Sequence, residues 1–158
     1  MAGRMSPDTG TLSTLDACLR IEETCAAIYR EFARSFAGTP DVARQWEAMS
    51  QEEEGHAEEF RRVIALHGRP DSLFESENYL IEAILEHIDS LHDKVRRNPP
   101  ELKDAYVIAM ILEQSIEKYH AEASSLIVNP TLAALLAKMA AHDQAHLELL
   151  KRAAEAVS

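Results

Sequence analysis

The feature that most constrains this chain is a helical repeat of apolar residues that ionisable residues interrupt halfway along. Five segments place apolar side chains at the three- and four-residue spacing of one helix face. In four of them a carboxylate stands near the middle of that face, and in two of these a histidine follows three residues later. Such side chains are costly to bury unless they are paired or bind a metal. The positions are Glu22, Glu53, His56, Glu113, Asp143 and His146.

Turn and capping residues separate the five segments. Ser13 with Asp16 resembles a capping box that begins a helix near residue 14. Gly38-Thr39-Pro40 ends that helix and begins the second, which runs to about residue 67, before Gly68. The remaining helices are expected at about 77–97, 101–126 and 130–156, the last one capped by Asn129. The chain is therefore predicted to be all-α, a single domain over 1–158 with a flexible N-terminus at about 1–12.

The segment at 77–97 differs from the other four because its apolar face has no ionisable residue at its centre. The stripe consists of Leu80, Ile84, Ile88, Leu91 and Val95. A helix of this length spans about 30 Å, which is close to the length of a helical bundle. The expected fold is a four-helix bundle, with this segment as an additional helix in the long crossover between the second and third bundle helices.

Composition excludes several classes of function. The formal net charge of −11 argues against binding to nucleic acid, whose phosphates require a basic surface. No apolar run is long enough to cross a membrane, and the N-terminus lacks the apolar core of a secretory signal, so a cytoplasmic protein is expected. The two cysteines, Cys18 and Cys25, lie too far apart on one helix to form a disulfide and are expected to pack in the core.

The positions of the ionisable residues within the two predicted hairpins indicate a metal centre. A carboxylate three residues before a histidine is weak evidence, since 27 acidic residues and 7 histidines give about one such pair by chance, although the chain has four. However, Glu22 and Glu113 lie about 16 and 15 residues before the hairpin turns at 38–39 and 128–129. The pairs Glu53/His56 and Asp143/His146 are centred about 16 residues after those turns, which places all six side chains at one level of the bundle. Four buried carboxylates repel one another, and two divalent cations remove that cost. Histidine and carboxylate ligands suit iron or manganese.

The sequence also resembles a known family, the ferritin-like di-iron carboxylate proteins, and among them the rubrerythrins. The segments that carry the resemblance are Arg20-Ile-Glu-Glu-Thr-Cys-Ala-Ala-Ile-Tyr29, Glu52-Glu-Glu-Gly-His56, Leu112-Glu113 and Asp143-Gln-Ala-His146-Leu-Glu-Leu-Leu150. The resemblance implies a ferritin-like fold and two iron ions per chain. It also implies that Glu53 and Asp143 bridge or chelate, that Glu22 and Glu113 are terminal ligands, and that each histidine binds one iron.

Three departures from the family pattern limit what the resemblance implies. The chain has no four-cysteine iron centre of the rubredoxin type, so a separate protein is expected to donate electrons. Asp143 stands where the family usually has glutamate, and its carboxylate reaches one methylene less far. Ile116 occupies the position of a second glutamate that rubrerythrins often carry on their third bundle helix, with Glu117 one residue further on.

Several residues remain open from sequence. A shift of 90 residues relates the two hairpins and aligns Glu23, rather than Glu22, with Glu113, although the surroundings of Glu22 are more apolar. Tyr29 lies two turns from Glu22 and is either a core residue or a hydrogen-bonding partner of the ligands that can donate a proton. His120 lies two turns from Glu113 and is either a neighbour of the ligands or partly exposed, and Glu117 is a further candidate near the site.

The resemblance implies a cytoplasmic di-iron oxidoreductase that reduces hydrogen peroxide with electrons from an external donor, as a peroxidase in oxidative-stress defence. The first alternative is a ferroxidase that stores or carries iron, with oxygen as the oxidant. The second is a di-iron monooxygenase, which needs a cavity for an organic substrate. A homodimer is expected, in which the 77–97 helix packs against the bundle or against the partner.

Overall fold

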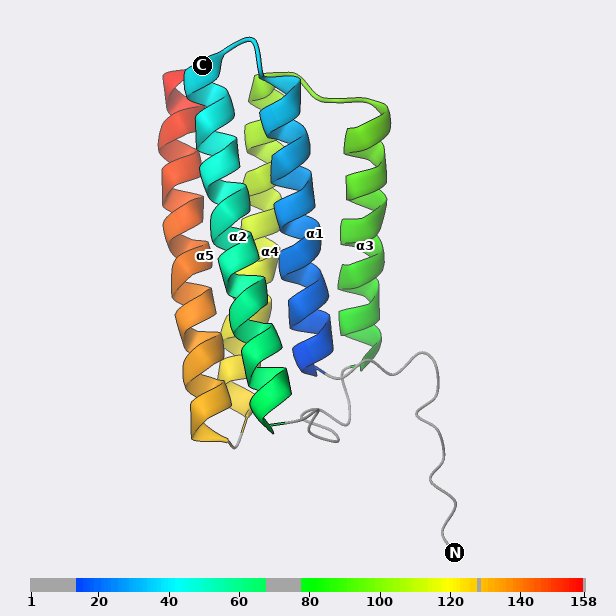
Figure 1. Cartoon of the computed structure of the whole chain (residues 1–158), viewed down its shortest axis with the longest axis vertical. Helices are drawn as coiled ribbons and strands as arrows, with labels where there is room; N and C mark the ends of the chain where they lie inside the picture. The colour runs from blue at the N-terminus through cyan, green and yellow to red at the C-terminus, as the bar shows by residue number, and fades with distance from the viewer. Residues whose placement is uncertain (1–13, 68–77, 128, 158) are drawn as a thin grey trace, which may run out of the picture.

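The computed structural model describes residues 14–67, 78–127 and 129–157 of the chain. It contains five helices in these ranges, which Figure 1 shows running side by side: α1 (Thr14–Ser35), α2 (Pro40–His67), α3 (Asn78–Arg97), α4 (Leu102–Leu126) and α5 (Pro130–Ala156). Each lies within about two residues of the segment expected from the apolar periodicity. The all-α prediction is therefore confirmed. The expected flexible N-terminus at 1–12 lies outside the described residues.

The helix ends follow from local chemistry. Asn129 is the N-cap of α5, and its side-chain oxygen accepts hydrogen bonds from the backbone N–H groups of Thr131 and Leu132, at 3.0 and 3.3 Å. These bonds satisfy two of the donors that have no partner within the helix. Pro40 and Pro130 each occupy the first helical position, where the missing N–H costs nothing. The proposed caps at Ser13 and Gly68 lie outside the described residues.

The chain forms two antiparallel hairpins, α1–α2 and α4–α5, with turns at opposite ends of the bundle (Figure 1). The helix α3 runs along the bundle between them in sequence and packs against α1. A salt bridge of 3.0 Å between Arg20 of α1 and Asp89 of α3 borders this contact. The expected crossover helix between the second and third bundle helices is confirmed.

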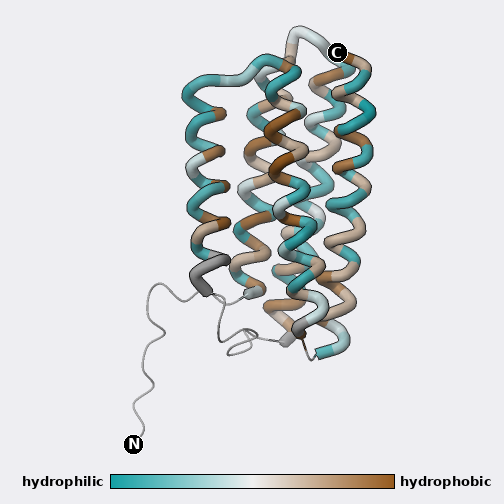
Figure 2. Tube along the Cα trace, turned by 180° about the vertical axis from the view of Figure 1, so that it is seen from behind, coloured by the Kyte–Doolittle hydropathy of each residue, from teal (hydrophilic) through white to brown (hydrophobic). Residues whose placement is uncertain are grey.

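The apolar stripe of α3 faces the other helices, as Figure 2 shows by hydropathy. Ile88 and Val95 are buried, as is Leu85, while Ile84 and Leu91 are half-buried. The stripe is thus covered within one chain. The side chain of Leu80 lies outside the described part.

The core consists of two apolar clusters. One contains the aromatic side chains of Tyr29, Phe32, Trp46 and Tyr106, and the other is built around Phe60 with residues such as Leu136 and Met139. On α2 and α5 the buried ionisable residues separate the two clusters along the helix. The ionisable layer is therefore closed by apolar packing on both sides.

Both cysteines, Cys18 and Cys25, are free and buried, as expected. Among the described helices, none is long and apolar enough to cross a membrane.

Candidate metal centre

All four bundle helices contribute buried ionisable side chains to one layer of the core. Each of these side chains is at most 6% exposed, so water reaches them poorly. The six residues expected from sequence are all among them, and a seventh joins them from α4. The set is Glu22, Glu53, His56, Glu113, His120, Asp143 and His146.

The seven side chains form three groups in which one ligand atom from each residue lies within 4.8 Å of the others. The groups overlap, since Glu22 belongs to two of them and Glu53 to two. A carboxylate that belongs to two groups can connect two ions. The groups are Glu22/Glu53/His56, Glu53/Glu113/His146 and Glu22/His120/Asp143.

The two histidines that follow an acidic residue by three positions turn the same ring nitrogen toward the carboxylates. Nδ1 of His56 lies 3.5 Å from Glu22 Oε2 and 3.3 Å from Glu53 Oε2. Nδ1 of His146 lies 2.8 Å from Glu53 Oε1 and 3.3 Å from Glu113 Oε1. Glu53 thus presents one oxygen to each histidine, which suits a carboxylate shared between two ions.

The spacing of these donor atoms, which hydrogen-bond to one another in the absence of a metal, also fits binding to a metal ion. Two ligand atoms bound to one ion at about 2.1 Å each lie about 3 to 3.6 Å apart, for bond angles of about 90° to 120°. Most of the distances between the histidine and carboxylate atoms fall in that range, beyond the usual length of a strong charged hydrogen bond. Oε1 of Glu22 and Oδ1 of Asp143 are buried and make no hydrogen bond within the described part of the chain. The donor set therefore fits iron or manganese.

Burial and mutual repulsion change the pKa values of the carboxylates in this layer. Burial, and then the negative charge of Glu53, raise the pKa of Glu22 well above its usual range. The same two causes raise the pKa of Glu113 to about 8. Burial also opposes ionisation of Glu53, but hydrogen bonds with Glu22, His146 and His56 outweigh it and lower its pKa below the ordinary range. Without cations, the layer must hold extra protons to stay neutral.

Two of the histidines hold some of these extra protons. Burial opposes protonation of His146, but hydrogen bonds to Glu113 and Glu53 raise its pKa to about 12. Burial likewise opposes protonation of His120, but its bond to Asp143 raises its pKa to about 10. Because a metal ligand must give up these protons, ions and protons compete for the same atoms.

The outer edge of the layer lies between α2 and α5. Nε2 of His56 lies 2.7 Å from Nδ1 of the partly buried His142, and Nε2 of His146 contacts the exposed carboxylate of Glu52. Each histidine thus turns Nδ1 inward and Nε2 outward. Partners of this kind fix the ring orientation and tautomer of a ligand histidine.

Tyr29 lies on the opposite side of the layer from that edge and donates a hydrogen bond of 2.5 Å to Glu113 Oε1. Its ring is fully buried, and its centroid lies 5.7 Å from that of Trp46. Burial, and then the charge of Glu113, raise the pKa of the Tyr29 hydroxyl, so it keeps its proton. The structure supports the interpretation of Tyr29 as a hydrogen-bonding partner of the ligands.

The structure answers the questions that the sequence left open. Glu22 is 1% exposed and lies within the layer, whereas Glu23 lies at the surface and pairs with Arg61 at 2.8 Å. Glu117 is only partly buried and belongs to none of the three groups. His120, which the sequence left as a neighbour or a partly exposed residue, is fully buried and contacts Asp143.

The spacing of His120 in the sequence indicates that it lies on the same helix face as Glu113. It lies seven residues after Glu113 and therefore two helical turns along the same face of α4. Glu52 and His142 were not predicted, because a polar residue next to a ligand on an exposed helix face has no distinctive spacing.

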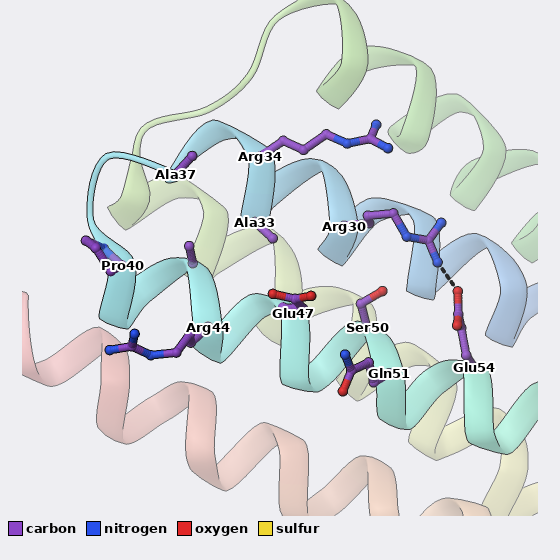
Figure 3. Close-up of a pocket in the computed structure, with 11 residues that line it drawn as sticks. Arg30, Ala33, Arg34, Ala37, Pro40, Arg44, Glu47, Ser50, Gln51 and Glu54 are labelled. Carbon is purple, nitrogen blue, oxygen red and sulfur yellow. Dashed lines mark hydrogen bonds and ion pairs between the residues drawn. The ribbon is translucent and has the colours of Figure 1, made fainter.

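Three hollows lie at the surface of the bundle, and the one shown in Figure 3 follows α1 and α2 near their connecting turn. Its lining includes Arg30, Glu47 and Ser50, and Arg30 forms an ion pair with Glu54 across it. None of the seven buried ionisable residues lines any of these three hollows. These three hollows are therefore separate from the buried layer.

Comparison with known proteins agrees with this geometry. No curated protein and no solved structure matches the sequence. A family model described as Rubrerythrin matches residues 14–154, a span that includes all five helices almost completely. The chain therefore belongs to the Rubrerythrin family of ferritin-like di-iron carboxylate proteins.

Proposed function

We propose that this protein is a di-iron peroxidase that reduces hydrogen peroxide with electrons from a separate donor protein. The observation that carries the proposal is the closed layer of four carboxylates and three histidines, which presents unpaired oxygen atoms to the interior. Membership of the Rubrerythrin family supports an oxidoreductase that uses such a layer.

The ligand residues of the proposed centre are Glu22, Glu53, His56, Glu113, Asp143 and His146, with Glu53 shared between two ions. Two ferrous ions, when bound there, supply the two electrons that convert one peroxide and two protons into two water molecules. An external reductant then restores those two electrons.

The protein's own residues position the reactants and supply protons. The hydrogen bond from Tyr29 to Glu113, with 2.5 Å between the two oxygen atoms, holds a proton beside a proposed ligand oxygen inside the buried layer. Because the Tyr29 hydroxyl keeps its proton at neutral pH, it is available as a donor when peroxide is cleaved. The apolar clusters above and below exclude bulk water, which favours a small oxidant over a large substrate.

The first alternative is a ferroxidase that stores or carries iron, because the same ligands can oxidise ferrous iron with oxygen. A monooxygenase is less well supported, since the three surface hollows are separate from the ligand residues. The proposal also includes a cytoplasmic location and a homodimer, and light scattering of the purified protein tests the homodimer.

Stopped-flow absorbance of the reduced, iron-loaded protein tests the peroxidase proposal. We expect oxidation by hydrogen peroxide to be at least about tenfold faster than oxidation by oxygen at equal concentration. Tyr29→Phe should slow the peroxide reaction by about tenfold or more while leaving the iron content unchanged, since proton donation contributes about 10²–10⁴-fold in enzymes. Tyr106→Phe is the matched control, because Tyr106 donates its hydrogen bond to Gln45 rather than to a ligand.

A preference for oxygen, together with iron accumulating beyond two ions per chain, contradicts the peroxidase proposal and supports iron storage. An equal effect of Tyr29→Phe and Tyr106→Phe contradicts the role given to Tyr29.

A further inference from the structure

The buried histidine of α4 has no place in the ligand set proposed so far. His120 is fully buried, and its Nδ1 lies 2.6 Å from Asp143 Oδ2. Its other ring nitrogen, Nε2, is also buried and makes no hydrogen bond of ordinary geometry within the described ranges, although the buried thiol of Cys18 lies near enough to contribute to the raised pKa of His120. A buried nitrogen without a partner is costly, so its orientation requires an explanation.

The contact with Asp143 determines which nitrogen of the neutral ring carries the proton. A carboxylate oxygen accepts hydrogen bonds, so the proton lies on Nδ1 and the lone pair lies on Nε2. This is the arrangement in which a carboxylate prepares a histidine to bind a metal through its other nitrogen.

The nitrogen Nε2 lies beside another residue of the layer of buried ionisable side chains. Nε2 lies 3.6 Å from Glu22 Oε1, which also lacks a hydrogen bond to the described residues. That distance is too long for a hydrogen bond but matches two ligands of one ion. The remaining oxygen of Asp143, Oδ1, is buried and without a hydrogen-bond partner as well. Two donor atoms from two helices, Glu22 Oε1 of α1 and His120 Nε2 of α4, therefore lie side by side.

Charge balance determines how many ions this arrangement can hold. The four carboxylates of the layer neutralise two divalent cations, and a third cation would leave two uncompensated positive charges in a buried site. A neutral histidine adds a ligand without changing this balance. His120 therefore suits a centre of two ions with one more nitrogen ligand, rather than a third ion.

We propose that His120 is a metal ligand, which binds through Nε2 to the same ion as Glu22. This inference rests on the proposed metal centre and adds a third histidine to it. Asp143 then holds the His120 ring in position through Oδ2, on the side of the ring away from that ion.

Cobalt(II) titration of the metal-free protein, followed by the ligand-field absorption of the bound cobalt, tests the proposal without an activity measurement. Two variants separate ligation from positioning. His120→Asn places an amide N–H near the position of Nδ1, and can still donate to Asp143, but has no atom at Nε2. His120→Leu removes both the donor to Asp143 and the nitrogen at Nε2. His87→Asn, at an exposed histidine of α3, is the control for the loss of a histidine.

We expect wild type and His87→Asn to bind two cobalt ions per chain with the same spectrum. Both His120 variants should bind one of the two ions about 100-fold more weakly, with a changed absorption for that ion. If His120→Asn binds both ions as wild type does, His120 only positions Asp143 and the proposal is wrong. If wild type itself binds no cobalt, the proposed metal centre is wrong. If all variants bind two ions as tightly as wild type does, only the proposed role of His120 is wrong.

Discussion

Glu53 is the residue on which the proposed centre depends most. It is 2% exposed, and its two oxygens face two different histidines, His56 at 3.3 Å and His146 at 2.8 Å. It is also the carboxylate whose pKa is lowered, because hydrogen bonds from its neighbours outweigh the cost of burial. It is therefore ionised at neutral pH, as a ligand shared by two cations must be.

Replacing Glu53 and His56 together with alanine should remove most of the bound metal. The double substitution takes away the shared carboxylate and one of the inward-facing nitrogens. Metal content per chain, measured by mass spectrometry after purification with iron, is expected to fall from about two ions to fewer than one.

The matched control is the alanine double substitution of Asp89 and His92. This pair has the same spacing but lies on α3, with Asp89 at the surface in a salt bridge with Arg20. It should retain the metal content of wild type. Unchanged metal in the Glu53/His56 variant removes the ligand assignment.

At the scale of elements, α3 stabilises the bundle without contributing to the metal centre. Its buried residues join the apolar cluster that contains Trp46, and none of the seven buried ionisable residues lies on it. An isolated helix of this length has little stability in water, so its apolar face must be covered. Because packing against α1 covers that face, α3 does not require a partner chain for burial.

Ile88→Ala is expected to lower the free energy of unfolding by about 2–5 kcal/mol while leaving metal content unchanged. Ile88 is 2% exposed, and truncation of a buried isoleucine loses apolar contacts and leaves a cavity. Urea unfolding followed by circular dichroism measures the change.

Glu86→Ala, at an exposed position of the same helix, is the control and should change stability by about 0.5 kcal/mol at most. Equal effects of the two substitutions would show that α3 is not packed as the structure describes.

At the scale of the whole molecule, the layer of buried ionisable side chains makes the folding stability depend on pH. In the metal-free protein burial raises the pKa of Glu113 from its ordinary 4.5 to about 8. The pKa of His120 rises from 6.5 to about 10, because its bond to Asp143 outweighs burial. Above the ordinary pKa of each group, the folded chain holds a proton that the unfolded chain has lost. Stability is therefore greatest below the ordinary values and falls as pH rises toward the raised ones.

The metal-free protein should accordingly lose thermal stability as pH rises from 5 to 8. The decrease in Tm is expected to be on the order of 10 °C or more, since one pKa unit corresponds to about 1.4 kcal/mol and 1 kcal/mol to about 2–4 °C at this size. Metal binding requires deprotonated ligands, so the stabilisation by added manganese should increase over the same range. Differential scanning calorimetry measures both effects.

Glu113→Gln removes one of the groups with a raised pKa, so the Tm of the metal-free protein should vary less with pH. A metal-free Tm that rises between pH 5 and 8 would contradict the pKa directions described above.

The sequence by itself determined the helices, because helix formation and capping depend on neighbouring residues. Asn129-Pro130 begins α5 and Pro40 begins α2 as predicted, and the apolar periodicity located the stripe of α3. It also brought six of the seven buried ionisable residues to one level, since equal distances from a turn correspond to equal heights in an antiparallel hairpin.

Only the tertiary structure decided which neighbouring residues face the centre. Glu22 and Glu23 differ by about 100° around α1, and packing against the other helices buries the first and leaves the second with Arg61 at the surface. The same holds for His120, whose partner Asp143 lies on a different helix, 23 residues away in sequence. Periodicity within one helix gives its apolar face, but the pairing of side chains across helices depends on how those faces rotate and meet.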